Sequence, residues 1–393
     1  MTIWYLHQYF RTPAQGGALR SYHLAHKLVT EGHVVHMVTA HNSPNYLVED
    51  IEGILVHYLP VPYDQSMGIV ARARSFRDFV DHVLAWVASE PQADFIYATS
   101  TPLSVGYLAY ALHKKYDIPY VFEVRDLWPD VPLQMAPKLR LLGPWLRKWE
   151  KRIYRHAQGV VALSPPMADT VVARSKDKAI ITIPNFADTQ VFRPAPKSEA
   201  WQRRWHVPEG HLVVAYTGSV GQANAPDTII KWLDAVAKSK LPITFLVAGE
   251  GSEWHRLETE AVKRGWTHVQ LLRYRNQAEI AEMLSGADLA LVTFKENVPV
   301  LGTNSPNKLF DALAAGCGVI TNRQGWYTDL LTDRGAGLQL DEQNLVPFLN
   351  YVLVDNEELD RMQAAARALA QSTYSKEALV DRWYAFLQER GLH

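Results

Sequence analysis

Short apolar runs recur along this chain, and stretches in which apolar residues have helical spacing lie between them. In the first half the runs fall at 2–6, 34–38, 54–59, 95–97, 120–122, 160–163 and 180–183. A polar loop at 7–17 follows the first run, and the helical pattern after it ends at Gly32. A strand, a glycine-containing loop, a helix and a second strand predict the start of a doubly wound α/β domain.

The second half repeats this organisation. Apolar runs at 213–217, 244–248, 269–272, 289–292 and 319–321 predict strands, and a helix is predicted at about 227–237. The turn-rich segment 183–194 separates the halves, and the stripe of apolar residues within 376–390 predicts a closing helix. We therefore expect an α/β protein with two Rossmann-like domains, 1–195 and 196–375.

The segment 301–316, LGTNSPNKLFDALAAG, joins a polar loop to an amphipathic helix. Ser305 is suited to cap this helix, Pro306 to its first turn and Gly316 to its end. Lys308 and Asp311 share a face close to the helix N-terminus, which carries partial positive charge. Such a helix start suits a phosphorylated ribose, with Lys308 and amides on phosphate and Asp311 accepting from ribose hydroxyls. The alternative is an ordinary amphipathic helix with a surface Lys–Asp pair.

Composition narrows the class of protein. Of 393 residues, 48% are hydrophobic and 21% charged, with a net charge of −1, which is typical of globular domains and gives no reason to expect nucleic acid. The single cysteine, Cys317, precedes an apolar run and is expected to be a buried apolar residue in a reducing compartment. The start of the sequence lacks a signal-peptide pattern, and no apolar stretch is long enough to span a bilayer. We expect a cytoplasmic protein, or one peripheral on the inner membrane.

Polar residues gather directly after the predicted strand at 120–122, in the segment EVRDLWPD. Ligands of open α/β sheets bind at the carboxyl ends of strands, where this segment lies. We predict that Arg125 and Asp126 face substrate; the alternative is a structural role. The other polar or aromatic residues of the segment are Glu123, Trp128 and Asp130.

The segment 135–155 predicts a helix with an apolar stripe and a basic face. The stripe consists of Leu142, Trp145, Leu146, Trp149 and Ile153. We expect this stripe to pack on the core and the basic face to be attracted to an anionic membrane surface or a lipid diphosphate. A solvated basic face without a ligand is the alternative. The basic residues are Arg147, Lys148, Lys151, Arg152 and Arg155, with Glu150 the only acid.

Six short segments, in this order and spacing, resemble bacterial glycosyltransferase family 4, of the GT-B fold. They are GG at 16–17, RDLWP at 125–129, IPNFADTQVFRP at 183–194, TGSVG at 217–221, GEG at 249–251 and SPNKLFDALAAG at 305–316. The pattern HQYF…GG…R is similar to the branch with O-antigen and capsule enzymes, including N-acetyl-L-fucosamine transferases. The resemblance covers almost the whole chain.

The resemblance implies a retaining, metal-independent hexosyltransferase. It implies two domains facing a cleft, a nucleotide-sugar donor held mainly by the second domain, and an acceptor held by the first, onto which 376–393 packs back. No Asp-x-Asp occurs in the sequence, which fits metal independence, and no cofactor is expected. Uridine is the expected base, and the expected acceptor is a polyprenyl-diphosphate-linked saccharide at the inner membrane face.

The resemblance also assigns residues. Asp311 matches the second acid of the family's paired-glutamate motif, but the first acid is replaced by Thr303, and the usual Arg and Lys are missing after the first strand of the second domain. Lys308 and the amides of 218–220 are expected to replace that pair, and Arg125 or Asp126 a histidine that contacts the donor sugar. The catalytic set is Asp126, Arg125 and Lys308, and the donor-binding set is Gly16, Gly17, Arg20, Gly218, Ser219, Val220, Thr303, Asn304, Ser305 and Asp311.

There are three alternative functions, and the pattern disfavours one of them. A nucleotide-sugar 2-epimerase of the same fold would use His7 with Glu123, Asp126 and Asp130 to move a carbon-bound proton. A dinucleotide dehydrogenase is disfavoured because PAQGGALR lacks the G-x-G-x-x-G spacing. A non-catalytic nucleotide-sugar-binding subunit of a glycan assembly complex is favoured by the missing first acid and the missing Arg/Lys pair.

Overall fold

The computed structural model describes residues 1–393 except 65–66, 176–177 and 274. The chain divides into two compact units, Met1–Pro184 with Thr303–Ser305 and Glu377–His393, and Asn185–Gly302 with Pro306–Lys376. The division falls after Pro184 and not at 195. The segment after Pro184 belongs to the second unit because Ala187 bridges to Ser375 and Asp188 pairs with Lys376 at 2.6 Å.

The first unit is built on an eight-stranded sheet in the order β3-β4-β2-β1-β5-β6-β7-β8. All neighbouring strands are parallel except β3 and β4, which form an antiparallel hairpin. The order reverses between β1 and β5, so the loops after these two strands flank a topological switch point. The strands are β1 (Thr2–Leu6), β2 (Val34–His41), β3 (Leu47–Ile51), β4 (Ile54–Pro60), β5 (Phe95–Thr99), β6 (Tyr120–Val124), β7 (Gly159–Ala162) and β8 (Ile180–Thr182).

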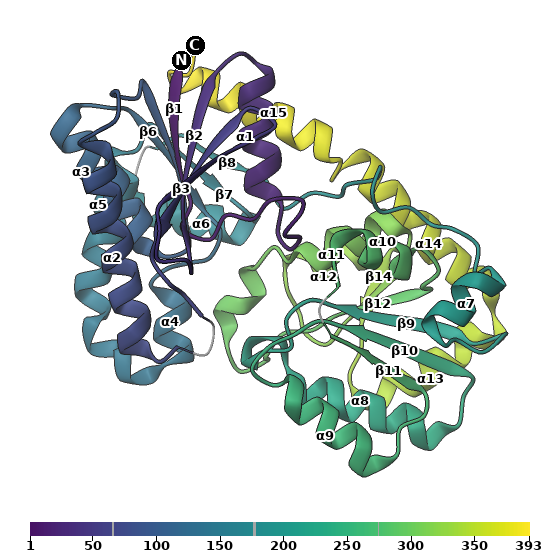
Figure 1. Ribbon diagram of the computed structural model, residues 1–393. Helices are drawn as coiled ribbons and strands as arrows, with labels where there is room; N and C mark the ends of the chain where they lie inside the picture. Colours follow the sequence, from purple (N-terminus) through teal and green to yellow (C-terminus); the bar gives the residue numbers. More distant parts are fainter. Residues whose placement is uncertain (65–66, 176–177, 274) are drawn as a thin grey trace. The chain divides into compact units, whose positions relative to one another are not determined.

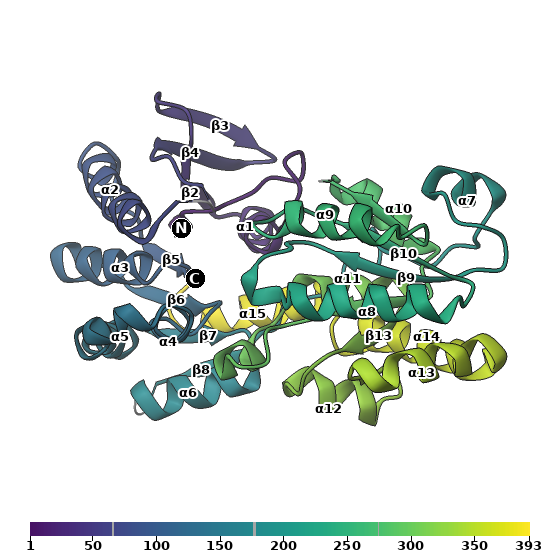
Figure 2. The same ribbon diagram turned by 90° about the horizontal axis from the view of Figure 1, so that it is seen from below.

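Helices cover both faces of this sheet, as the two views show: α2, α3 and α5 lie on one face, and α1 and α15 on the other (Figures 1 and 2). The central strands are therefore buried on both sides, and β5 and β6 have no exposed residue. The helical segments are α1 (Arg20–Thr30), α2 (Ile69–Val87), α3 (Leu103–Tyr116), α4 (Asp130–Met135), the 3-10 turn η1 (Pro137–Leu142), α5 (Gly143–His156), α6 (Pro165–Ser175) and α15 (Lys376–Glu389).

The second unit is built on a fully parallel six-stranded sheet in the order β11-β10-β9-β12-β13-β14. Its switch point lies between β9 and β12. Helices α8 and α9 lie on one face, and α10, α11 and α14 on the other (Figure 1). The strands are β9 (Leu212–Thr217), β10 (Ile243–Ala248), β11 (Val269–Leu272), β12 (Leu289–Val292), β13 (Gly318–Thr321) and β14 (Gly337–Gln339).

The helical segments of the second unit alternate with its strands, as the repeated organisation predicted. An additional helix, α7, precedes the first strand of this unit and is capped by the Ser198 side chain, which accepts from the amide of Trp201. The segments are α7 (Glu199–Trp205), η2 (Gln222–Asn224), α8 (Pro226–Ser239), α9 (Trp254–Arg264), α10 (Gln277–Ser285), η3 (Pro299–Thr303), α11 (Asn307–Ala315), α12 (Trp326–Asp333), α13 (Glu342–Val354) and α14 (Asn356–Ser372).

The predicted fold class, two doubly wound α/β domains with a last helix that returns to the first, is confirmed. In the first unit the indole N–H of Trp383 on α15 donates to the Tyr97 hydroxyl on β5 at 2.9 Å. Sequence reasoning missed β3, which is exposed along most of its length, and the short β14. Cys317 is fully buried and burial raises the pKa of its thiol, as expected for an apolar role.

Two predictions for 301–316 are wrong in detail. The segment before the helix is not a simple loop, because Pro299–Thr303 forms the 3-10 turn η3. The N-cap of α11 is Pro306, which has no polar side chain, and not Ser305. The prediction for the other end is confirmed: Gly316 ends α11 at φ 76°, a left-handed conformation that glycine adopts without strain.

Candidate functional site

Lys308 is the cation at the switch point of the second unit. It is the second residue of α11, and its side chain passes over β9. Its Nζ lies 3.9 Å from the centre of the Tyr216 ring and 3.5 Å from Oδ1 of Asn224. Burial lowers the pKa of Lys308 to about 7, because desolvation disfavours the ammonium. No carboxylate of the described residues pairs with Lys308, so this desolvated lysine is suited to receive an anion.

The loops around Lys308 are held to each other by buried hydrogen bonds. Thr293, directly after β12, donates to the Asn224 carbonyl at 2.7 Å. The Asn322 side chain, directly after β13, accepts from the Phe294 amide and donates to the Phe294 carbonyl, both at 2.9 Å. The edge formed by the carboxyl ends of β9, β12 and β13 is therefore fixed before any ligand binds, which lowers the entropic cost of binding.

Two glycines allow the loop after β10 to lie directly against the loop after β9. A Cβ on Gly249 would lie 1.9 Å from the Gly218 carbonyl oxygen, and one on Gly251 would lie 2.4 Å from the Val220 carbonyl oxygen. This approach corrects one prediction. The amides of Gly218 and Val220 do not face a ligand, because they donate to the carbonyls of Ala248 at 2.9 Å and Glu250 at 2.7 Å.

Ser219 lies between these two bonded amides and is exposed. Its carbonyl accepts from the Tyr216 hydroxyl at 2.7 Å, which holds the loop over the ring that Lys308 covers. Gly218 has φ 100° and lies beside Lys308, since a Cβ there would be 3.7 Å from the Lys308 Cε. The loop and Lys308 thus come together, as the sequence predicted, although through the side chain and not through the amides of Gly218 and Val220.

Asp311 lies one turn beyond Lys308 on α11 and is half-buried. Burial, and secondarily the negative charge of Asp188, raises the pKa of Asp311 to about 7. A carboxyl group with a pKa near 7 is partly ionised at neutral pH, and its ionised form can accept hydrogen bonds from hydroxyl groups. The donor contacts predicted for Asp311, Thr303, Asn304 and Ser305 stay predictions. The last three of these residues group with the first unit.

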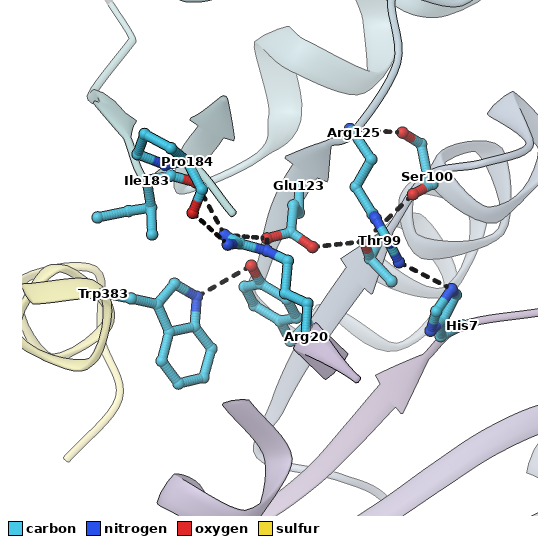
Figure 3. A network of polar contacts seen from close by, with 10 residues as sticks. His7, Arg20, Thr99, Ser100, Glu123, Arg125, Ile183, Pro184 and Trp383 are labelled. Carbon is cyan, nitrogen blue, oxygen red and sulfur yellow. Dashed lines mark hydrogen bonds and ion pairs between the residues drawn. The ribbon is translucent and has the colours of Figure 1, made fainter. Parts of the chain in front are cut away.

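The carboxyl edge of the first sheet brings together His7, Ser100 and Arg125 (Figure 3). They follow β1, β5 and β6, which are neighbours in the sheet. The Arg125 guanidinium lies 3.3 Å from Nε2 of His7, and the Arg125 amide donates to the Ser100 hydroxyl at 3.0 Å. His7 is buried, and its pKa is lowered well below the usual value by burial and by Arg125. The ring is therefore neutral and accepts from Arg125.

Asp126 follows Arg125 and is half-buried. Burial raises the pKa of Asp126 to about 6, and the positive charge of Arg125 opposes this rise. Within the part of the chain that the structure describes, Asp126 and Arg125 form no ion pair with each other. Both remain at the carboxyl edge where the sequence placed them.

Arg20 and Glu123 have a different role from the one predicted. They form a buried ion pair at 2.8 Å, and the Arg20 guanidinium also donates to the carbonyls of Ile183 at 3.0 Å and Pro184 at 2.6 Å (Figure 3). The second oxygen of Glu123 accepts from the Thr99 hydroxyl at 2.6 Å. These contacts argue against Arg20 as a phosphate ligand and against Glu123 as an acid–base residue.

Gly16 and Gly17 form a turn with positive φ values of 65° and 91°, for which glycine is needed. The Gly16 amide bonds back to the carbonyls of Thr12 at 3.0 Å and Pro13 at 3.2 Å. The turn thus uses the Gly16 amide itself, and the predicted donor contact of Gly17 stays a prediction.

The basic helix α5 is oriented differently from the prediction. Glu150, expected on the basic face, is fully buried and pairs with Arg174 of α6 at 2.6 Å. Two residues of the expected core stripe, Leu142 and Trp145, are 51% and 61% exposed. The buried face of α5 is formed by Glu150, which pairs with Arg174, and by Ile153 and Tyr154. Because this face packs inward, the start of the apolar stripe is turned toward solvent.

Arg174 also bonds Asp130, which in turn pairs with Arg147 at 2.6 Å. Asp130 is therefore structural and not a substrate group. Arg152 lies over the Trp149 ring at 5.0 Å. Lys148, Lys151 and Arg155 are exposed, and no ion pair involves them among the described residues.

Sequence reasoning missed Tyr216 and Asn224 as partners of Lys308, and Arg174 as the partner of Glu150 and Asp130. It named His7 for the epimerase alternative but not as a partner of Arg125. Each reaches its contact from a separate element, so spacing along the chain gives no signal. Among the described residues, no group of three or more His, Cys, Asp or Glu side chains is placed to hold a metal ion. In the same part of the chain, no helix combines the length and apolar character that crossing a membrane requires.

Comparison with known proteins gives family and fold. A family model for a glycosyl transferase 4-like domain matches residues 15–185, and one for glycosyl transferases group 1 matches 197–369. An Escherichia coli K12 protein described as a colanic acid biosynthesis glycosyl transferase, WcaI, is 23% identical over 207 residues, which are 50% of this chain and 49% of that protein. The chain thus matches about half the length of this curated relative.

Two solved structures are similar over nearly the whole chain. Sucrose-phosphate synthase from Thermosynechococcus elongatus has a TM-score of 0.78 at 18% identity, with 99% of this chain and 98% of that chain covered. Anabaena HepE, in complex with UDP and glucose, has a TM-score of 0.72 at 15% identity, with 99% and 100% covered. With one family model on each unit and this fold, the chain belongs to glycosyltransferase family 4 and has the GT-B architecture.

Proposed function

We propose that this protein is a retaining glycosyltransferase that moves a sugar from a nucleoside-diphosphate sugar to a growing surface polysaccharide. UDP is the proposed nucleotide, and the proposed acceptor is a saccharide linked to a polyprenyl diphosphate at the inner membrane face. The name of WcaI supports polysaccharide biosynthesis, and the HepE complex supports UDP as the nucleotide. The proposed branch is that of the O-antigen and capsule enzymes.

One observation carries this proposal: the desolvated Lys308 beside Gly218 at the switch point of the second unit. Departure of a nucleoside diphosphate leaves negative charge on the phosphate oxygens, and a nearby cation lowers the energy of that state. An ammonium over an aromatic ring and next to an amide oxygen is positioned before the reaction, so little reorganisation is needed. We propose that Lys308 binds the diphosphate and Asp311 the ribose hydroxyls.

In the first unit we propose that Asp126 and Arg125 contact substrate at the reacting centre. The leaving phosphate can itself accept the acceptor proton in a retaining reaction of this kind, so no separate base is assigned. We propose that no metal is required, since the sequence contains no Asp-x-Asp pair of the kind that holds a divalent cation between protein and diphosphate.

The experiment that tests the function is a screen of UDP-, GDP- and ADP-sugars, including UDP-N-acetyl-L-fucosamine, with a polyprenyl-diphosphate saccharide as acceptor. We expect transfer from a UDP-sugar, an unchanged anomeric configuration by NMR, and equal rates with chelator and with Mg²⁺. Lys308→Met should abolish transfer, and Lys263→Met, on the exposed surface of α9, should not. Interconversion of C2 epimers without transfer would identify an epimerase, and UDP binding without turnover of any donor would identify a binding subunit.

We also propose that the corner formed by η1 and α5 binds the anionic inner membrane surface. Leu141 is 93% exposed and lies with the exposed Leu142 and Trp145. Exposed basic side chains also lie on η1 and α5, and together with these apolar residues they match an interfacial segment that inserts apolar residues below lipid headgroups. The exposed basic residues are Lys138, Arg140, Lys148, Lys151 and Arg155.

Sedimentation with vesicles tests this second part of the proposal. Vesicles with one quarter phosphatidylglycerol should bind the protein, and pure phosphatidylcholine vesicles should bind it far less. Leu141→Ser with Trp145→Ser should weaken binding, while Val262→Ser, at a residue 85% exposed on the second unit, should not. Equal binding by all variants would show that this corner is not the membrane contact.

A further inference from the structure

Two arginines lie near the carboxyl edge of the first sheet, and they differ in whether a carboxylate pairs with them. Arg20 is buried, and its guanidinium is paired with Glu123 and bonded to two carbonyls. Arg125 is half-buried, and in the described part of the chain it forms no ion pair within 4.0 Å. A half-desolvated guanidinium without a directly paired carboxylate is unusual, because the charge has lost part of its hydration and gains no ion pair in return.

Glu123 could have neutralised Arg125, since it lies only two residues earlier in the chain. Both of its oxygens are already bonded, one to Arg20 at 2.8 Å and the other to the Thr99 hydroxyl at 2.6 Å (Figure 3). Asp126 is adjacent in sequence but also makes no ion pair with Arg125 among the described residues. The buried carboxylate of Glu123 is therefore paired with Arg20, and the Arg125 guanidinium can bind an anionic ligand.

His7 holds Arg125 without neutralising it. The imidazole Nε2 lies 3.3 Å from the guanidinium, so Nε2 is the acceptor and the ring proton is assigned to Nδ1. Nδ1 has no hydrogen-bond partner among the described residues. The Arg125 backbone is fixed by its bond to Ser100 at 3.0 Å. The contact with His7 uses one of the five guanidinium N–H groups, and no hydrogen bond to a described residue uses the other four.

We propose that Arg125 is an anion-binding residue of the first unit that takes a phosphoryl group of the substrate, and that His7 is its positioning residue. The inference rests on the proposed function, in which both substrates contain a diphosphate. A planar guanidinium binds two phosphate oxygens in parallel, and its position beside the switch point between β1 and β5 is where open α/β sheets bind ligands. A neutral imidazole suits this role because it orients the guanidinium and adds no negative charge beside it.

Binding of inorganic pyrophosphate to the full chain, measured by calorimetry in saturating UDP, tests the proposal. UDP occupies the Lys308 site, so pyrophosphate reports a second anion site. We expect Arg125→Gln to weaken pyrophosphate binding roughly tenfold or more, with UDP affinity unchanged. Arg77→Gln, at an exposed arginine of α2 in the same unit, should change neither.

The two possible sources of the phosphoryl group give different results. If Arg125 binds the acceptor, the outcome is the one just described. If Arg125 binds the donor, saturating UDP prevents pyrophosphate binding and Arg125→Gln weakens UDP itself. Unchanged affinity of Arg125→Gln for both ligands would overturn the inference while leaving the donor site of the second unit intact. Absence of any UDP binding would instead overturn the proposed function, and pyrophosphate alone would then still test Arg125.

His7 is tested by rescue with a conservative variant. His7→Gln keeps an acceptor near the Nε2 position and should retain pyrophosphate binding, whereas His7→Phe keeps the ring shape and should lose it to the extent that Arg125→Gln does. In the Arg125→Gln background, His7→Phe should have no further effect. Equal binding by His7→Gln and His7→Phe, both folded by circular dichroism, would refute the positioning role.

Discussion

The lowered pKa of Lys308 makes a quantitative prediction about UDP binding. With a pKa of about 7, caused by burial, the free protein at pH 8 carries the Lys308 proton in about one tenth of molecules. A bound diphosphate favours the ammonium and raises this pKa, so binding at pH 8 must take up protons. Asp311, with a pKa of about 7, is then mostly ionised and releases about 0.1 proton when hydroxyls bind it. The expected net uptake is about 0.8 proton per UDP.

The same pKa values fix how affinity depends on pH. Above the free pKa of Lys308, each molecule must first be protonated, so affinity falls as pH rises. Between pH 7.5 and 8.5 this effect alone weakens binding about eightfold, and the completed ionisation of Asp311 reduces the net change to about sixfold. Lys308→Met should remove the proton uptake and this loss of affinity, and at pH 7.5 it should bind UDP at least roughly tenfold more weakly than the wild type.

Calorimetry at pH 8 in two buffers of different ionisation enthalpy measures the proton uptake directly. Lys263→Met serves as the control, because this lysine of α9 is exposed and lies on the same unit. A wild-type uptake near zero, or an affinity that is constant from pH 7.5 to 8.5, would show that Lys308 does not bind the diphosphate as an ammonium. Proton uptake that persists in Lys308→Met would assign it to another group.

Three further predictions concern the scaffold around the site. Arg20→Gln leaves Glu123 charged, buried and unpaired and should cost about 3–5 kcal/mol in urea unfolding, whereas Arg77→Gln, at an exposed ion pair of the same unit, should cost less than about 1 kcal/mol. Gly249→Ala places a Cβ 1.9 Å from the Gly218 carbonyl oxygen, so the two loops must separate and the UDP-induced rise in Tm should be lost. Trp383→Phe removes the hydrogen bond to Tyr97 and should lower the free energy of unfolding by about 1 kcal/mol in the same urea measurement.

The fold could be predicted from the sequence because its strands are buried on both faces and therefore appear as short continuous apolar runs. The bounds of β1, β11 and β12 match the predicted runs residue for residue. The strands that were missed lack this signal: β3 lies at an edge and is mostly exposed, and β14 has three residues. Burial on both faces, and not strand propensity alone, is what made the pattern readable.

The candidate site could be predicted only where its residues lie on one element. Lys308 and Asp311 share α11, so their proximity follows from helical spacing. Arg20 was misassigned because its partner Glu123 is distant in sequence, and a buried ion pair leaves no mark in local spacing. The amides of the loop after β9 were misassigned for the same reason, since their acceptors belong to the segment around 248–250.

The proposed anion-binding residues of the two units are Lys308 and Arg125, and they differ in how their charge depends on pH. Measuring ligand affinity as a function of pH can therefore distinguish their contributions. The cation of the second unit is a lysine whose pKa lies near neutrality, so its affinity for an anion changes across the physiological range. The cation of the first unit is an arginine, which keeps its charge throughout that range. The loss of UDP affinity as pH rises should therefore vanish with Lys308→Met and persist in Arg125→Gln. If Arg125→Gln removed it instead, Lys308 would not be the group whose titration governs UDP binding.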